Sequence, residues 1–239
     1  MKTCSTEPKI KMNKEPVVYT KPRNRIVELC EYYEIELGTL YIYDYIIGFD
    51  LEAINLVYNL PENKEPSNVL QFTSKQIPLS FSTMSNLDGY NTPHFFWSKD
   101  SKDIVVKIFD YFDEVQKKSN DLMMNKLKPL LDKISEHRNK YYNKHLEEVT
   151  IYCSSIPIVG FNSGGYDINS MLEYGFLDEI LKRDPEHFNL NNGKRYKAIK
   201  TKQFTFLDEM LYCASGTTLD KFLKCFSKSK DDHKFHVFL

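Results

Sequence analysis

The amino-acid sequence predicts an α/β (α+β) domain with a mixed central sheet flanked by helices. The chain has 239 residues, 41% of them hydrophobic, which allows one domain with a sizeable core. Short apolar runs rich in β-forming residues end at turns, and stretches with helical spacing lie between them. We expect residues 25–239 to form this domain. Residues 1–24 are polar and show no periodicity, which predicts a mobile leader.

The first part of the domain is predicted to contain a three-stranded meander. Residues 45–54 form an apolar run with acids embedded in it, which is typical of a buried central strand. Residues 58–75 are rich in Pro, Asn, Glu and Lys and predict a loop. Residues 77–84 alternate as in a strand, and residues 93–97 follow a turn as a third strand. The order of elements before residue 45 stays open.

The middle of the chain is predicted to be helical over residues 103–148. Apolar residues recur at helical spacing up to Val115, and a more charged stretch follows around residues 127–145. We interpret the charges of this stretch as a solvated face. Residues 156–161 then form a short apolar strand, which a glycine-rich turn connects to a helix at about residues 166–174.

The last part of the chain is predicted to hold a hairpin and a helix. Residues 195–201 and 203–208 have the pattern of two paired strands. Residues 218–226 have the spacing of a helix, with a threonine near its N-cap. Residues 227–239 receive no assignment.

Composition and charge argue against several classes of protein. The formal net charge of −1 and the pI near 6.6 give no overall basic field for nucleic acid, although local basic patches can still hold a backbone. The five cysteines are odd in number and lack CxxC spacing, which argues against a zinc site and a disulfide framework. No apolar run approaches the roughly 20 residues of a membrane span, and the start lacks the apolar segment of a signal peptide. We therefore expect a soluble, intracellular protein without a membrane partner.

The first candidate motif is the acidic pair Asp50-Leu-Glu52 at the end of the first apolar run. Side chains at i and i+2 of a strand point to the same face, so the two carboxylates converge on one side of the sheet. Paired hard oxygen ligands of this kind suit Mg²⁺ or Mn²⁺, which promote phosphodiester hydrolysis. The alternative is a strand end at which both acids face water.

The second candidate motif is the glycine-rich segment that ends at Asp167. A strand delivers Asn162 to its C-terminal end, two glycines permit a tight turn, and Asp167 enters the first turn of a helix. The segment has neither a following GK[ST] nor GxGxxG spacing, which argues against a nucleotide phosphate loop. A capping role for Asp167 is the alternative.

Taken together, the two motifs resemble the first two exonuclease motifs of family B DNA polymerases. Asp50-Leu-Glu52 is similar to the first motif. Residues 162–167 match the second, which consists of an Asn, three further residues, an aromatic residue and an Asp. Residues 77–86, 200–208 and 216–222 are similar in order and character to the protein-primed branch of that family, found in Maverick-type transposons, viruses and linear plasmids. The resemblance covers roughly residues 46–226.

This resemblance implies the N-terminal 3′-5′ exonuclease region of a DNA-directed DNA polymerase, with a ribonuclease H-like fold. It implies that Asp50, Glu52 and Asp167 bind two Mg²⁺ or Mn²⁺ ions around the scissile phosphate of a frayed, single-stranded 3′ end. Asn162 and Tyr166 would hold the terminal nucleotides, Tyr166 by stacking on a base. The implied partners are this DNA end and a terminal protein that primes replication.

A basic hairpin could bind the DNA backbone as well. Its cationic residues are Lys194, Arg195, Lys197, Lys200 and Lys202. Of these, Lys200 and Lys202 are our candidate DNA ligands. A solvated hairpin is the alternative.

Two features depart from the family pattern. Asp208 lies near the place where protein-primed members carry a Ser/Thr-Leu motif, but Glu209 and Met210 follow it here, so we interpret Asp208 as structural. The third exonuclease motif, a Tyr, three residues and an Asp, does not occur after residue 226, and neither does the palm signature Tyr-x-Asp-Thr-Asp. In a continuous helix, the earlier match that ends at Asp178 would lie about 16 Å along the axis from Asp167. We therefore expect residues 1–239 alone to have little or no exonuclease activity.

Two further functions stay open at the level of sequence. One is a non-catalytic remnant that grips single-stranded DNA, and the other is a stand-alone ribonuclease H-like nuclease. Metal-dependent degradation of a 3′-labelled strand separates an enzyme from a binding protein.

Overall fold

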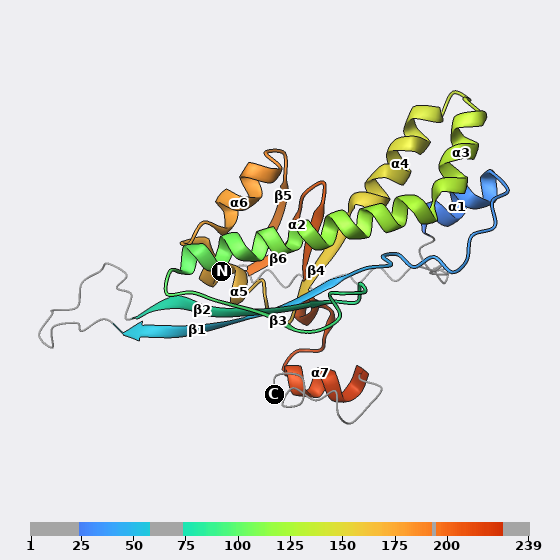
Figure 1. Cartoon of the computed structure of the whole chain (residues 1–239). Coiled ribbons are helices and arrows are strands. Elements are labelled where there is room, and N and C mark those ends of the chain that lie inside the picture. The colour runs from blue at the N-terminus through green and yellow to red at the C-terminus, as the bar shows by residue number, and fades with distance from the viewer. Residues whose placement is uncertain (1–23, 58–73, 193–194, 227–239) are drawn as a thin grey trace, which may run out of the picture.

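The chain folds into an α/β structure built on one mixed sheet, as predicted (Figure 1). The structure is a computed structural model that describes residues 24–57, 74–192 and 195–226. Residues 1–23 of the predicted leader, most of the predicted loop at 58–75, Lys194 and the residues after 226 lie outside this description, whereas Asn24 is the N-cap of the first helix. The seven strands are arranged in the order β3-β2-β1-β4-β7-β6-β5. Their bounds are β1 Ile47–Val57, β2 Ser74–Ser85, β3 His94–Trp97, β4 Ile156–Gly160, β5 Phe188–Asn192, β6 Arg195–Lys200 and β7 Phe204–Asp208.

The centre of the sheet is formed by the two runs that are apolar on both faces. β1 pairs antiparallel with β2 and parallel with β4, and β4 pairs parallel with β7. This confirms the prediction that the first apolar run is central and that the strand at 156–161 lies beside it. β2 continues to β3, and β7 continues through the predicted hairpin to β6 and then to β5, which the sequence did not predict as a strand.

The acidic pair does not lie at a strand end, which corrects the prediction. β1 continues to Val57, because its second half pairs with the first half of β2 as a two-stranded extension beyond β4. Asp50 follows directly after Phe49, the last β1 residue paired to β4. Asp50 and Glu52 therefore lie just past the parallel part of the sheet, at the start of the two-stranded extension of β1 and β2.

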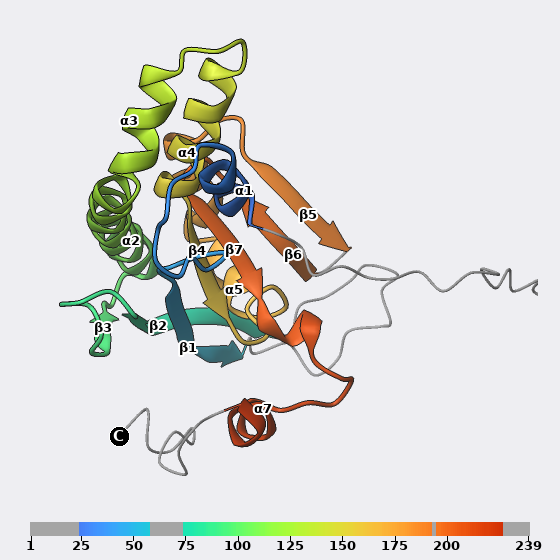
Figure 2. The same cartoon turned by 90° about the vertical axis from the view of Figure 1, so that its right-hand side faces the viewer.

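One long helix covers one face of the sheet. α2 (Ser101–Lys126) packs its apolar side against the inward side chains of β1, β2 and β4, and Figures 1 and 2 show it along that face. Ile47, Phe49 and Leu51 of β1 point into this core, so Gly48, Asp50 and Glu52 point to the opposite face. Figure 1 shows α7 (Leu219–Phe226), which the sequence predicted, off that opposite face.

The predicted helical region is broken into three helices. After α2 come α3 (Lys128–Glu136) and α4 (Tyr142–Ser154), and the break near Leu127 coincides with Pro129 in the first turn of α3. Proline lacks the N–H that would continue the preceding helix, but it fits the first turn of the next one. With α1 (Arg25–Tyr32), α3 and α4 form a helical projection whose core includes Leu130, Ile134 and Val149. Figure 1 shows this projection beyond the end of the sheet.

Two short helices follow β4. α5 (Asp167–Leu172) is shorter than predicted, because the chain turns at Gly175, whose φ of 92° is left-handed, and begins α6 (Phe176–Arg183). A single 3-10 turn, η1 (Glu209–Tyr212), follows β7. Among the described residues, no helix is both long and apolar enough to cross a bilayer.

Candidate functional site

The candidate site lies at the carboxyl-terminal edge of the three parallel strands. The register pairs Phe49 with Gly160 and Gly160 with Asp208. Asp50, the turn after Gly160 and the end of β7 therefore meet at one edge of the sheet. Ligands of open α/β sheets commonly bind outside this edge. Both motifs that carried the sequence prediction thus converge on a plausible location for chemistry.

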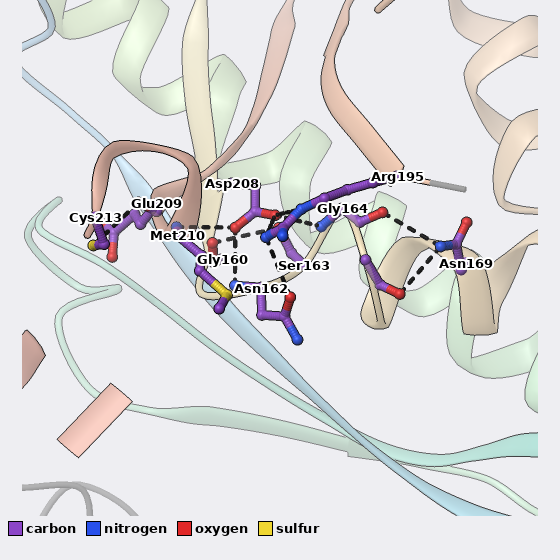
Figure 3. Close-up of polar contacts among 11 residues, drawn as sticks. Gly160, Asn162, Ser163, Gly164, Asn169, Arg195, Asp208, Glu209, Met210 and Cys213 are labelled. Atoms are coloured by element: carbon purple, nitrogen blue, oxygen red, sulfur yellow. Dashed lines mark hydrogen bonds and ion pairs between the residues drawn. The ribbon is translucent and has the colours of Figure 1, made fainter. Parts of the chain in front are cut away.

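Asp208 holds the glycine-rich turn in place. Its side chain is 2% exposed, and its carboxylate accepts hydrogen bonds from the backbone N–H groups of Asn162 (2.9 Å), Gly164 (3.2 Å) and Met210 (3.0 Å). Figure 3 shows these bonds converging on the carboxylate. A buried carboxylate with several N–H donors fixes the loop that supplies them. This anchoring agrees with the structural role predicted for Asp208.

Arg195 completes this anchor from β6. Its Nη2 and Nε lie 2.6 Å and 3.1 Å from Oδ2 of Asp208, and Nη2 also donates to Oδ1 of Asn162 at 3.2 Å. The sequence grouped Arg195 with lysines that could track DNA, but its guanidinium is directed inward (Figure 3). The physical reason is that a buried carboxylate needs a compensating cation. Asn162, a predicted DNA ligand, likewise already uses its side-chain oxygen within the turn.

The shape of the turn depends on backbone conformations that few residues tolerate. Asn162 has a left-handed φ of 63°, which Asn adopts more readily than most residues. Gly164 lies against β6, where Tyr196 donates its N–H to the Gly164 carbonyl at 2.9 Å. A Cβ on Gly164 would lie only 1.8 Å from the Tyr196 carbonyl oxygen. The turn therefore brings the start of α5 against the sheet only with glycine at this position.

Asp167 is the buried acid of the site. It begins α5, as predicted, and its side chain is 2% exposed. The pKa of Asp167 is raised to about 8, mainly by burial and then by the negative charges of Asp50, Asp208 and Glu52. The carboxylates of Asp50, Glu52 and Asp208 therefore lie close enough to Asp167 to disfavour its negative charge. Such a group of acids is costly without a cation between them.

The same acids also influence Tyr166, the residue before Asp167. Burial is the largest cause of its raised pKa, followed by the charges of Asp167, Glu52 and Asp50. The phenol therefore keeps its proton at neutral pH and can donate a hydrogen bond beside the carboxylates. Thus Asp50, Glu52, Tyr166 and Asp167, all predicted from the sequence, are brought into electrostatic contact.

The donor chemistry of this group suits Mg²⁺ or Mn²⁺. Both are hard cations that prefer carboxylate oxygens, which Asp50, Glu52 and Asp167 supply. Within residues 24–57, 74–192 and 195–226, no group of three or more Asp, Glu, His or Cys side chains is arranged to hold a metal ion. Mg²⁺ is usually bound by one or two carboxylates together with waters and substrate phosphates. The acids therefore fit such an ion chemically, and their closure around a metal pair stays a prediction.

The structure does not bring the predicted lysines to this edge. Lys200 pairs with Thr205 near the start of β7, and Lys202 lies in the connection before that strand. At about 3.3 Å per residue, they lie roughly 10 Å and 20 Å along the strand from Asp208. At that far end the backbone N–H of Lys202 donates to Asp184 at 2.8 Å, and its Nζ lies 3.9 Å from Glu186. The predicted DNA-binding role of these lysines gains no support from their placement.

Asp178 is also separate from the acidic group. The helix that begins at Asp167 ends at Leu172, and Asp178 lies in the first turn of α6, after the left-handed Gly175. Asp178 thus lies on a different helix from Asp167, in agreement with the separation expected for this acid. A negative side chain in the first turn of a helix is favourable in its own right.

The sequence patterns did not predict that Arg195 pairs with Asp208, or that Asp208 accepts hydrogen bonds from the glycine-rich turn. The two residues are thirteen positions apart on adjacent antiparallel strands, and only the hairpin register brings them together. One available clue was that Asp208 ends an apolar strand, since a buried acid there requires partners.

A scan against protein-family models and searches of curated proteins and of solved structures found no match for this chain.

Proposed function

We propose that this chain is the metal-dependent 3′-5′ exonuclease region of a DNA-directed DNA polymerase of the protein-primed family B type. The proposal combines the two sequence motifs with their meeting at one sheet edge. The α/β architecture, with a mixed sheet and flanking helices, is compatible with the ribonuclease H-like fold that the resemblance implies. A terminal protein that primes replication belongs to the same proposal as a partner.

The buried acid at the start of α5 carries the proposal. Asp167 has a pKa of about 8 because it is buried and faces Asp50, Asp208 and Glu52. A structural capping acid at an exposed helix start would not need this environment. Perturbed acids grouped in this way are typical of sites that bind cations or perform acid–base chemistry. A divalent cation among these carboxylates would relieve their repulsion.

Each residue of the site has a distinct role in this proposal. Asp50, Glu52 and Asp167 would hold the metal ions, which orient a water molecule and neutralise charge on the leaving oxygen when bound. Tyr166 would donate a hydrogen bond to the DNA end or offer its ring to a base. Asp208 and Arg195 act indirectly, because they hold the turn that positions Asp167.

A non-catalytic single-stranded DNA-binding protein is the second candidate. The observation in its favour is that the described part of the chain holds no set of three acids arranged around an ion. The same observation leads us to expect slow cleavage under the first proposal, because an incompletely held ion misplaces the attacking water.

The experiment uses the whole chain and a single strand labelled at its 3′ end, with Mg²⁺ or Mn²⁺. Anisotropy measures binding, and a denaturing gel follows the length of the strand. We expect metal-assisted binding and slow shortening from the 3′ end, both weakened in Asp50→Asn and Asp167→Asn. Asp178→Asn, which removes an exposed acid of α6, is the matched control and should behave as wild type.

The outcomes separate the alternatives. Metal-dependent binding without any shortening supports the binding protein. Robust shortening that disappears in Asp50→Asn supports the site but contradicts the expected low activity. Absence of binding, or cutting from the 5′ end or within the strand, contradicts the proposed function.

A further inference from the structure

Two large aromatic side chains are exposed on the edge strand β3. Phe95 is 62% exposed and Trp97, the only tryptophan of the chain, is 71% exposed. They alternate with His94 and Phe96, which point toward the α2 side of the sheet. Aromatic rings of this size are normally buried, so two neighbouring ones on the same open face indicate a binding surface.

The register of the sheet places these rings in line with the acidic pair. Asp50 pairs with Ser82, and Ser82 pairs with Phe95. In the next row on the same face, Glu52 pairs with Ser80, and Ser80 pairs with Trp97. Directly paired residues share a face of the sheet. Each aromatic residue therefore lies in the same cross-strand row as one acid, with a single serine between them.

The spacing of these rows suits a single nucleic-acid strand. Neighbouring strands lie about 4.8 Å apart, so β3 is roughly 10 Å from β1 across the rows. The serines between them have short side chains, so little side-chain volume separates the rings from the acids within each row. Lys99, two residues after Trp97, is exposed and can contact a phosphate of a strand that continues past Trp97.

A cavity joins the inner end of this surface to the candidate site. It has a volume of about 240 Å³ and lies between the open sheet face and α7. Phe95 and Asp50 both line it, together with Phe161 of the glycine-rich turn and Leu219 and Leu223 of α7. An apolar hollow with a carboxylate at its edge can accept a planar base while a phosphate remains near the acids.

We propose that Phe95 and Trp97 form a stacking platform for the bases of single-stranded DNA whose 3′ end lies at Asp50 and Glu52. This inference rests on the proposed function and assigns a substrate-binding surface to β3. Aromatic stacking tolerates any base, because every base has a π-face. The platform therefore supplies affinity without sequence preference. A protein partner on β3 would not require the alignment of both rings with both acids.

The single tryptophan makes a direct test possible. Oligothymidylate of about eight nucleotides, within the usual range of single-strand sites, is titrated into the wild-type chain in EDTA so that the strand stays intact. A base stacked on Trp97 quenches its fluorescence, and we expect quenching that saturates together with the anisotropy of the labelled strand. The measurement uses the unaltered protein, so it doesn't depend on the folding of a variant.

Variants then measure the contribution of each ring. Phe95→Ala and Trp97→Ala should each weaken strand binding on the order of tenfold, whereas Trp97→Phe should retain most of the affinity. Phe188→Ala is the matched control, because Phe188 is 59% exposed on β5 at the opposite edge of the same sheet. It should bind as wild type does.

The possible failures are distinguishable. Strand binding with unchanged Trp97 fluorescence and unaltered affinity in both alanine variants overturns the platform and leaves the proposed function intact. Absence of strand binding under all conditions, with or without metal, overturns both. A concentration-dependent dimer that Trp97→Ala dissolves, seen by sedimentation, identifies β3 as a contact between copies and overturns the platform.

Discussion

At the scale of single residues, the acids of this site differ in what their surroundings do to them. Asp167 is buried among other acids and has a pKa raised to about 8, whereas Asp208 is equally buried but lies against Arg195 and three backbone N–H groups. Asp208 is thus surrounded by hydrogen-bond donors, whereas Asp167 lies near other acids. Residues kept in an unfavourable environment are commonly those that serve function.

The environment of Asp167 predicts a pH-dependent stability. Its folded pKa of about 8 lies above the ordinary value of 3.8, so its protonated form stabilises the fold. That contribution is fully present below about pH 4 and is lost as pH rises toward 8. Asp167→Asn should therefore unfold at higher urea than wild type at about pH 9, by a few kcal/mol in unfolding free energy.

Urea unfolding followed by circular dichroism at about pH 5 and pH 9 measures this difference. The difference between Asp167→Asn and wild type should grow with pH between these values. Asp178→Asn is the control and should give the same difference at both. A constant difference for Asp167→Asn would contradict the raised pKa.

Gly164 gives a second prediction at this scale. A Cβ at this position would lie 1.8 Å from the Tyr196 carbonyl oxygen, so Gly164→Ala must displace β6 or the turn. We expect a loss of about 1–3 kcal/mol in unfolding free energy and weaker metal binding, because the turn positions Asp167. Gly38→Ala, where no atom lies within 4 Å of the added Cβ, is the control for thermal melting. Equal melting temperatures for the two variants would contradict the close approach.

At the scale of elements, strand patterns were more informative than helix patterns. The runs at 45–54 and 156–161 predicted the central strands, because strands buried on both faces leave a continuous apolar pattern. The helical region was correctly located but its breaks were not, and α6 and β5 were missed. Short elements like these form through tertiary packing more than through their own propensity, so the sequence holds little information about them.

The helical projection of α1, α3 and α4 is an element-scale feature with its own core. Ile134 of α3 is fully buried there and is separate from the core under the sheet. Ile134→Ala should cost about 2–4 kcal/mol and speed amide hydrogen exchange in α3 and α4. Exchange in β1 and β4 should change less. Uniform acceleration across the sheet would show that the two cores unfold as one unit.

At the scale of the whole molecule, the sheet brings distant segments to one edge. The motif residues around Asp50 and Asp167 are more than a hundred positions apart, and the parallel pairing of β1 with β4 makes them neighbours. The two motifs predicted which acids lie near this edge, because Asp50 follows the last β1 residue paired to β4 and Asp167 follows the turn after β4. They could not predict the inward turn of Arg195, the distance of Lys200 and Lys202, or the rows that lead to Phe95 and Trp97. Those depend on strand register, which local sequence patterns do not specify.

The central claim is that Asp50, Glu52 and Asp167 form a divalent-cation site, and Mn²⁺ binding followed by electron paramagnetic resonance tests it most directly. We predict that wild type binds Mn²⁺ more tightly as pH rises from about 6 to about 9, because the ion competes with the proton on Asp167. Asp50→Asn and Asp167→Asn should each weaken binding on the order of tenfold or more, and Asp178→Asn should not. Affinity that is independent of pH and equal in Asp167→Asn and Asp178→Asn would contradict the account.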